Sequence, residues 1–253
     1  MIPLPEERHS IILSAIEARE FISIVELGDR LNVSRETIRS DISHLAKQNL
    51  LQQVRGGATR IEKTEAAMSE RQNINHAGKQ KIGQIVAGII PDGASVIIDS
   101  GSTTLAAARA LTEKNDLTIY TNDLTVALTM VASAAEVQVL GGKLGRSEHS
   151  TRGHDTLEML SNYRADFSLI GVGGLSAEHG FTDYDRDVAK MRDAMIAAAA
   201  TPLFVAGHEK FGKSASVRLR LADQAAFLAT DIQPTTELAT YLKQLGLDVL
   251  TPE

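Results

Sequence analysis

Residues 33–47, VSRETIRSDISHLAK, decide the fold of the first part of this chain, because they predict a helix with a well-defined start. Ser34 is a favourable N-cap, since its hydroxyl can accept a hydrogen bond from a backbone amide in the first turn. Ile38, Ile42 and Leu45 recur at helical spacing and form the side that is expected to be buried. The polar residues of the first two turns are left facing solvent.

Two helical patterns precede this helix and a hairpin pattern follows it. Residues 5–17 are expected to form the first helix, with a proline in its first turn. The second helix begins after Ser23, with Glu26 placed as in a capping box. Its connection to the third helix is as short as a helix-turn-helix corner. Residues 50–59 alternate around a Gly-Gly turn. Together these patterns predict a winged helix-turn-helix domain over residues 1–60.

The third helix and the hairpin carry the side chains that are expected to contact DNA. Residues 30–60 hold six basic and two acidic side chains, whereas residues 63–253 hold 18 basic and 23 acidic ones. Arginine can bond a guanine edge or a phosphate, and serine and threonine hydroxyls suit phosphate oxygens. The predicted DNA-binding residues are Ser34, Arg35, Glu36, Thr37, Arg39, Ser40, Arg55, Gly56, Gly57 and Arg60. The alternatives are a plain three-helix bundle with solvated charges and an adaptor domain for a partner protein, and the basic third helix and hairpin oppose both.

The remainder of the chain has a different pattern. Residues 61–76 are polar with little apolar periodicity, so they are predicted to form a linker that is partly helical. In residues 77–253, short apolar runs such as 94–98 alternate with helical segments such as 103–111. This alternation is typical of a mostly parallel sheet that helices cover on both faces. The predicted fold class is therefore α/β: an N-terminal winged helix-turn-helix domain followed by an α/β domain with a doubly covered, mostly parallel sheet.

Polar and glycine-rich segments follow several of the predicted strands. Asp99–Thr104 lies directly between a strand and a helix, where backbone amides and hydroxyls suit a phosphate. Residues 121–123, 141–143, 171–174 and 207–212 occupy comparable positions. Because ligands bind at the carboxyl ends of the strands in such sheets, we expect a binding site at this edge.

These motifs resemble the DeoR family of bacterial transcriptional regulators. In the first domain the resemblance rests on residues 33–42 and on Arg55-Gly56-Gly57-Ala58. In the second domain it rests on segments that stand in the family's order, namely residues 98–104, 121–122, 140–142, 170–174 and 210–212. The resemblance implies a sensor domain similar to the ribose-5-phosphate isomerase fold and an effector that is a phosphorylated sugar or polyol. The implied effector-binding residues are Asp99, Gly101, Ser102, Thr103, Thr104, Thr121, Asn122, Gly141, Gly142, Lys143, Gly173, Lys190, Arg192 and Lys210.

The chain departs from the family's commonest pattern at a few of these positions. Ser40 stands where a second consecutive arginine is usual, and Arg55 stands where a histidine is frequent. Lys190 and Arg192 stand where the family usually has Glu and, two residues on, Lys. Changes at the base-reading surface leave DNA binding credible but alter the expected operator, and the extra cation would suit a more anionic effector.

Composition excludes several other classes of protein. The chain of 253 residues has no cysteine, which excludes disulfide scaffolds, zinc fingers and cysteine nucleophiles. Neither a secretory signal nor an apolar run long enough for a membrane span is visible, so the protein is expected to be cytoplasmic and not membrane-bound. No cofactor, metal site or catalytic residue is predicted.

The sequence therefore predicts a sequence-specific DNA-binding transcriptional regulator. We expect it to repress a carbohydrate or polyol catabolic operon, to bind double-stranded operator DNA as a homodimer or homotetramer, and to be relieved by a phosphorylated sugar. The alternative is a sugar-phosphate isomerase-like enzyme with an accessory DNA-binding domain. Isomerisation through an enediol needs a carboxylate base, and Asp99 is the candidate.

Overall fold

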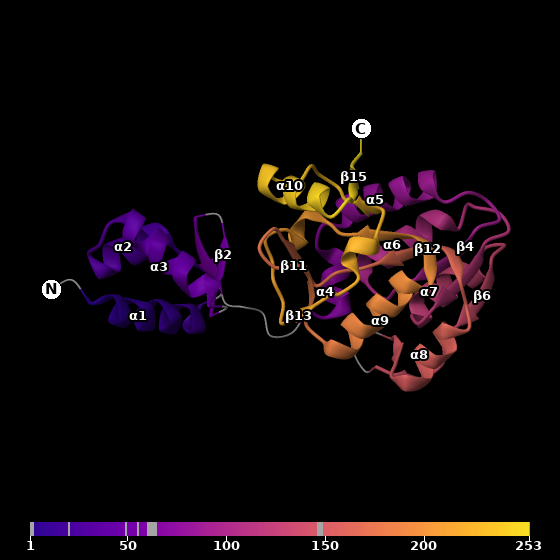
Figure 1. Ribbon diagram of the computed structural model, residues 1–253, viewed down its shortest axis with the longest axis horizontal. Helices are drawn as coiled ribbons and strands as arrows, with labels where there is room; N and C mark the ends of the chain where they lie inside the picture. The colour runs from indigo at the N-terminus through magenta and orange to yellow at the C-terminus, as the bar shows by residue number, and fades with distance from the viewer. Residues whose placement is uncertain are drawn as a thin grey trace. The chain divides into compact units, whose positions relative to one another are not determined.

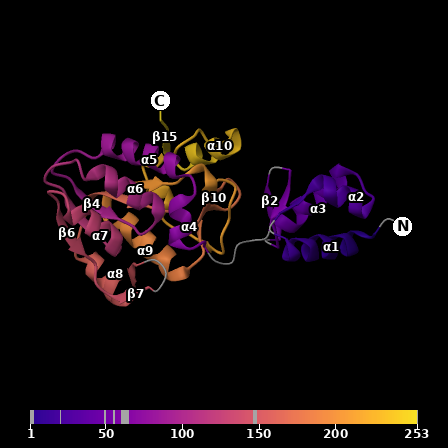
Figure 2. The same ribbon diagram turned by 180° about the vertical axis from the view of Figure 1, so that it is seen from behind.

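The computed structural model describes residues 3–19, 21–48, 50–54, 56–59, 65–145 and 149–252. The chain divides into two compact units, residues 1–63 and residues 64–253. Figures 1 and 2 show their elements from opposite sides. Among the described residues, no helix has both the length and the apolar character that crossing a bilayer requires.

The first unit has the three helices and the hairpin that the sequence predicts. Its elements are α1 (Pro5–Ala18), β1 (Phe21–Ser23), α2 (Ile24–Leu31), α3 (Arg35–Lys47), β2 (Gln52–Val54) and β3 (Gly57–Thr59). The sequence did not predict β1, which pairs with β3 and makes the hairpin a three-stranded antiparallel sheet. A three-residue strand is too short to show an alternating pattern, so only the pairing partner reveals it.

Buried side chains of the three helices and the sheet form one apolar core in this unit. The side chains of Ile38, Ile42 and Leu45 are buried in it, as the helical spacing predicts. Ser23 caps α2 by accepting a hydrogen bond from the Glu26 amide over 3.0 Å. The Glu26 carboxylate bonds to Arg19 over 2.6 Å. The structure therefore shows the serine half of the predicted capping box.

The two glycines of the hairpin have different physical roles. Gly56 has φ +86°, a left-handed conformation that the tight turn requires and that glycine adopts without strain. Gly57 lies under β1, where a Cβ atom would come within 2.1 Å of the Ile22 carbonyl oxygen. A side chain at position 57 would therefore push β1 off the sheet.

The second unit contains a seven-stranded sheet in the order β15-β14-β12-β9-β4-β5-β6. All of its neighbouring strands run parallel, which confirms the predicted sheet. Its elements are α4 (Met68–Asn73), α5 (His76–Ile89), β4 (Ser95–Ile98), α6 (Ser102–Leu111), β5 (Thr118–Thr121), α7 (Leu124–Val131), β6 (Glu136–Val139), β7 (Lys143–Leu144), β8 (Thr151–Arg152), α8 (His154–Ser161), β9 (Ala165–Ile170), β10 (Gly174–Ser176), β11 (Gly180–Asp183), α9 (Arg186–Ala197), β12 (Ala199–Val205), the 3-10 helix η1 (His208–Lys210), β13 (Val217–Arg218), the 3-10 helix η2 (Ala222–Gln224), β14 (Phe227–Ala229), α10 (Thr236–Gln244) and β15 (Asp248–Leu250).

Helices cover both faces of this sheet, as predicted. Along β4, Val96 and Ile98 belong to the core shared with α5, α6 and α7, whereas Ile97 belongs to the core shared with α8, α9 and α10. The alternation follows from the two-residue period of a strand, and both faces are apolar because both are covered.

Some elements of the second unit were not predicted. Residues 65–76, which belong to the predicted and partly helical linker, contain α4, but the burial of Met68 in the core of the second unit was not predicted. The small antiparallel sheet β10-β11-β13 and the β7-β8 pair were also not predicted. Each of these strands contains at most one large apolar residue, so none of them forms the apolar run that predicts a strand of the main sheet.

Candidate functional site

The first turns of α3 form a polar surface on the first unit. Ser34, Arg35, Glu36, Arg39 and Ser40 are exposed, and Thr37 is half-buried beside them. Ser34 Oγ accepts a hydrogen bond from the Thr37 amide over 3.1 Å and lies 2.8 Å from Thr37 Oγ1. The predicted N-cap is therefore present, and it leaves hydroxyl groups at the positive end of the helix dipole, which favours an anion such as a phosphate.

Arg39 is an exposed cation of this surface and takes part in an ion pair. Its Nη1 lies 3.0 Å from Glu36 Oε2, and both side chains are well exposed. An exposed ion pair of this kind contributes little to stability, so Arg39 can leave Glu36 for a guanine or a phosphate at low cost. Glu36 thus orients the guanidinium without burying it.

The hairpin residues can be placed only in part. Arg55 and Arg60 lie outside the described residues. Gly56 is exposed at the turn, whereas Gly57 is buried and pairs with Ser23 and Val54. Gly57 therefore supports the sheet beneath the turn.

A buried ion pair that the sequence reasoning missed holds α3 against α1. Arg8 Nε donates to Asp41 Oδ2 over 2.8 Å and Arg8 Nη2 to Asp41 Oδ1 over 2.9 Å, while His9 Nε2 lies 3.1 Å from the same carboxylate. Burial alone would raise the pKa of Asp41, but the hydrogen bonds from Arg8 and His9 outweigh it and lower the pKa. The carboxylate is therefore charged, and it fixes α3 on its inner side.

The second candidate site begins where β4 ends. Gly101 has φ +149° and is the N-cap of α6, and Thr104 Oγ1 donates to its carbonyl oxygen over 2.9 Å. Ser102, Thr103 and Thr104 follow in the first turn of α6 and are largely buried. The first backbone amides of α6 have no partners within the helix and can bind an anion.

Asp99 is part of a buried charge network at the same edge of the sheet. Its Oδ2 accepts from Arg192 Nε over 2.7 Å and from the Gly171 amide over 3.1 Å. The Arg192 guanidinium also forms an ion pair with Asp183. The predicted residues Asp99 and Arg192 therefore meet, although they come from different elements. Asp183 is a member of the network that was not predicted.

The end of β5 adds an unusual acceptor group. Thr121 Oγ1 donates to the Ile98 carbonyl over 2.7 Å, and Asn122 Nδ2 donates to the Thr151 carbonyl over 3.0 Å. Asn122 Oδ1 is buried and has no hydrogen-bond partner among the described residues. Because a buried carbonyl oxygen normally has a donor, Asn122 is suited to accept from a ligand hydroxyl. The neighbouring Asp123 caps α7, and its burial raises its pKa.

The other predicted effector-binding residues occupy varied positions. Lys143 in β7 and Lys190 in α9 are exposed. Gly142, which has φ +137°, lies so close to Thr156 that a Cβ atom would clash with Thr156 Oγ1. The backbone amide of the neighbouring Gly141 faces the sulfur of Met159. Gly173 is buried, and its amide donates to the Thr182 carbonyl.

Lys210 lies in a second charge cluster, with partners that the sequence reasoning missed. Its Nζ lies 2.7 Å from Glu65 Oε1, and Arg71 Nη1 lies 3.1 Å from Glu65 Oε2. Lys79 Nζ donates to the Ile74 carbonyl over 2.7 Å and lies 3.7 Å from Glu209 Oε1. Lys79 could have been found from the sequence, since it shares the buried face of α5 with Ile82 and Val86. A lysine on an apolar face needs a partner.

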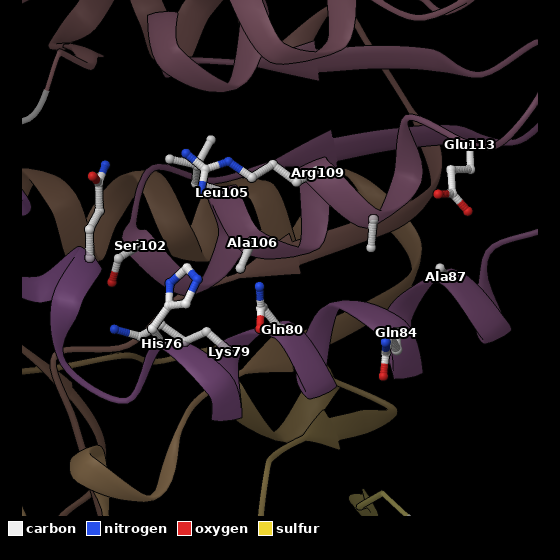
Figure 3. Close-up of a pocket in the computed structure, with 12 residues that line it drawn as sticks. His76, Lys79, Gln80, Gln84, Ala87, Ser102, Leu105, Ala106, Arg109 and Glu113 are labelled. Carbon is white, nitrogen blue, oxygen red and sulfur yellow. The ribbon is translucent and has the colours of Figure 1, made fainter.

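A pocket of about 510 Å³ lies between α5 and α6. Figure 3 shows Ser102 at the same end of this groove as His76 and Lys79, with Ala87 and Glu113 at the other end. Ser102 thus belongs to the first turn of α6 and also lines an open groove with basic side chains.

A helix-turn-helix unit joined to an α/β unit with a polar strand edge defines the class of ligand-sensing transcriptional regulators. The model of the DeoR-like helix-turn-helix domain matches residues 8–64, and the model of the DeoR C terminal sensor domain matches residues 74–232. The chain belongs to the DeoR family.

Similar proteins cover almost the whole chain. The HTH-type transcriptional repressor CsqR of Escherichia coli (strain K12) is 32% identical over 248 residues, which is 97% of this chain and 95% of the relative. The Glycerol-3-phosphate regulon repressor of the same organism is 30% identical over 238 residues, or 93% and 94% of the two chains. Among solved structures, ribose 5-phosphate isomerase A from Methanocaldococcus jannaschii is similar over 54% of this chain and 55% of the isomerase chain, with 12% sequence identity and a TM-score of 0.40.

Proposed function

We propose that this protein represses a carbohydrate or polyol catabolic operon by binding operator DNA, and that a phosphorylated sugar or polyol relieves the repression. Similar chains that match over nearly their full length are named as repressors, one of them of a glycerol-3-phosphate regulon. The observation that carries the effector half of the proposal is the first turn of α6, whose leading backbone amides have no partner within the helix and whose Ser102 lines a pocket. The protein would act in the cytoplasm, where operator DNA lies.

The first unit supplies the DNA contacts in this proposal. Arg35 and Arg39 reach base edges in the major groove, while Ser34, Thr37 and Ser40 contact phosphates. The hairpin residues around Gly56 approach the sugar-phosphate backbone of the DNA beside the major groove. We expect a symmetric homodimer or homotetramer on repeated half-sites, because operator symmetry mirrors protein symmetry.

The second unit supplies the effector contacts. The phosphate is held by the first turn of α6 and by the Lys210 ammonium, and a sugar hydroxyl donates to Asn122 Oδ1. The buried ion pair between Asp99 and Arg192 supports this site by holding the loop that precedes α6. Lys143 and Lys190 remain outer cations that an effector with more than one anionic group could reach.

An isomerase-like function is less well supported. The only carboxylate considered as a base, Asp99, has Oδ2 bonded to both the Arg192 guanidinium and the Gly171 amide. Because this oxygen is buried and already accepts from two donors, it is not placed to reach a substrate carbon. The protein is therefore proposed to bind sugar phosphates without turning them over.

Thermal unfolding of the full chain with a panel of phosphorylated sugars and polyols tests the proposal. At least one phosphorylated compound should raise the unfolding temperature and lower operator affinity, whereas its unphosphorylated form should do neither. The Gly101→Val variant should lose the stabilisation and keep operator binding. Product formation from any compound in the panel, or stabilisation that survives Gly101→Val, would contradict the proposal.

A further inference from the structure

Glu65 lies in the cluster around Lys210 and is the first described residue after the DNA-binding unit. Its carboxylate lies between the Lys210 ammonium at 2.7 Å and the Arg71 guanidinium at 3.1 Å. Its side chain is only 16% exposed, and those of Lys210 and Arg71 are 15% and 9% exposed. A carboxylate between two cations offers them anionic acceptor oxygens, as a phosphate group would.

The segment that carries Glu65 is attached to the second unit at two points. Glu65 holds its first end. Asn75 holds the other, because its Nδ2 donates to Glu209 Oε2 over 2.8 Å and to Asp231 Oδ2 over 2.9 Å. Between them, the main-chain carbonyl groups of Arg71 and Ile74 accept from the Lys79 ammonium. Residues 65–76 are thus held to the second unit by ion pairs and hydrogen bonds, and by the buried side chain of Met68.

The electrostatics of Glu65 agree with this role. Burial alone would raise its pKa, but the positive charges of Lys210, Arg71 and Arg192 outweigh burial and lower the pKa. Glu65 is therefore an anion, and the positive charge of Arg192, which pairs with Asp99, also stabilises its charged form. The two charge clusters at the sheet edge act on one carboxylate.

We propose that Glu65 is a built-in competitor for the effector's phosphate: the phosphate displaces the Glu65 carboxylate from Lys210 and releases residues 65–76 from the second unit. This inference rests on the proposed function, since it concerns the same effector. It links the two units physically, because residues 65–76 directly follow the chain that leaves the DNA-binding unit. The effector then favours the released segment, as a ligand must favour one arrangement to shift an equilibrium.

Hydrogen exchange of the full chain tests this proposal with inorganic phosphate as the probe and sodium chloride at equal ionic strength as the control. The amides of Arg71 and Ile74, which bond to Ala67 and Glu70 within α4, report on the segment. Phosphate should speed their exchange in the wild-type protein. In Glu65→Gln their exchange should be fast without phosphate. Phosphate should bind this variant about tenfold more tightly than the wild-type protein. This factor is expected if Glu65 leaves Lys210 free to bind phosphate in a fraction of about 0.1 of the wild-type molecules.

Glu70→Gln is the matched control, because Glu70 is an exposed glutamate of the same segment. It should behave as the wild-type protein does. If phosphate binds and Lys210→Gln abolishes that binding while α4 exchange stays unchanged, the competitor role of Glu65 is overturned and the effector site stands. If neither wild type nor Glu65→Gln binds phosphate or any sugar phosphate, both proposals are overturned. The wild-type exchange measurement decides the question even where Glu65→Gln fails to fold.

Discussion

Arg192 Nε donates to Asp99 Oδ2 over 2.7 Å in the interior of the second unit, and the same guanidinium pairs with Asp183. The bond joins α9 to the loop between β4 and α6. One cation therefore holds the loop of the candidate effector site against a helix that packs on the sheet. Both side chains are almost fully buried. The network therefore positions the first turn of α6, and it leaves two buried carboxylates if the arginine is removed.

The Arg192→Met variant should lower the free energy of unfolding of the second unit by about 3–5 kcal/mol, because Asp99 and Asp183 would remain buried without their cation. All four tyrosines of the chain lie in the second unit, so tyrosine fluorescence during urea unfolding reports on this unit. Lys190→Met on the exposed side of the same helix is the control and should change stability by less than about 0.5 kcal/mol. Equal effects of the two variants would mean that the network is not stabilising.

The Asp41→Asn variant should loosen the first unit, because Arg8 and His9 would lose their anion while Arg8 stays buried. We expect a loss of about 2–3 kcal/mol, seen as faster hydrogen exchange of α1 and α3 in the full chain. Asp29→Asn, an exposed residue of α2, is the control. Unchanged protection of α3 in Asp41→Asn would show that apolar packing alone holds this helix.

The same carboxylate makes the first unit sensitive to acid. The folded-state pKa of Asp41 lies below its unfolded value of about 3.9. Its contribution is therefore fully present above that unfolded value and is lost as the pH falls through the lower folded pKa. In the wild-type protein, the protection of the α3 amides from hydrogen exchange should decrease when the pH is lowered below about 4. Asp41→Asn should lack this part of the pH dependence, and a drop of the same size in both proteins would assign it to other groups.

The Arg39→Ala variant should weaken operator binding by about 1–3 kcal/mol and leave effector-induced thermal stabilisation unchanged. The operator fragment can be obtained by selection from random duplexes, and affinity should be measured at one fixed salt concentration. Lys243→Ala, which removes an exposed charge from the second unit, is the control. Operator affinity that is the same in all three proteins would remove Arg39 from the interface.

Two glycines of neighbouring elements should respond oppositely to alanine. Gly101→Ala should destabilise the second unit by about 1–3 kcal/mol, because φ +149° is strained for a residue with a side chain. Gly88→Ala in α5 should stabilise it by about 0.5–1 kcal/mol, since a Cβ atom there meets open space and alanine favours a helix. Tyrosine fluorescence during urea unfolding measures both. A stable Gly101→Ala would mean that this loop can take another conformation.

Much of the fold follows from local patterns in the sequence. The cap at Ser34 and the apolar spacing of Ile38, Ile42 and Leu45 predict the observed α3, and the alternating runs predict the parallel sheet. The strands β1 and β10 were missed because their sequences contain no apolar run and only the pairing with a partner strand reveals them. The polar sequence around α4 predicts a linker, and it does not show that Met68 is buried in the core of the second unit.

The candidate sites divide in the same way. Local patterns predict which residue types stand at the strand ends and on the outer face of α3, because hydrophobic periodicity sets the side that each residue faces. The pairings of Asp99 with Arg192 and of Glu65 with Lys210 are seen only in the folded chain, since their members are 93 and 145 residues apart. Long-range ion pairs leave no periodic signal in a single sequence, since their geometry depends on how distant elements pack.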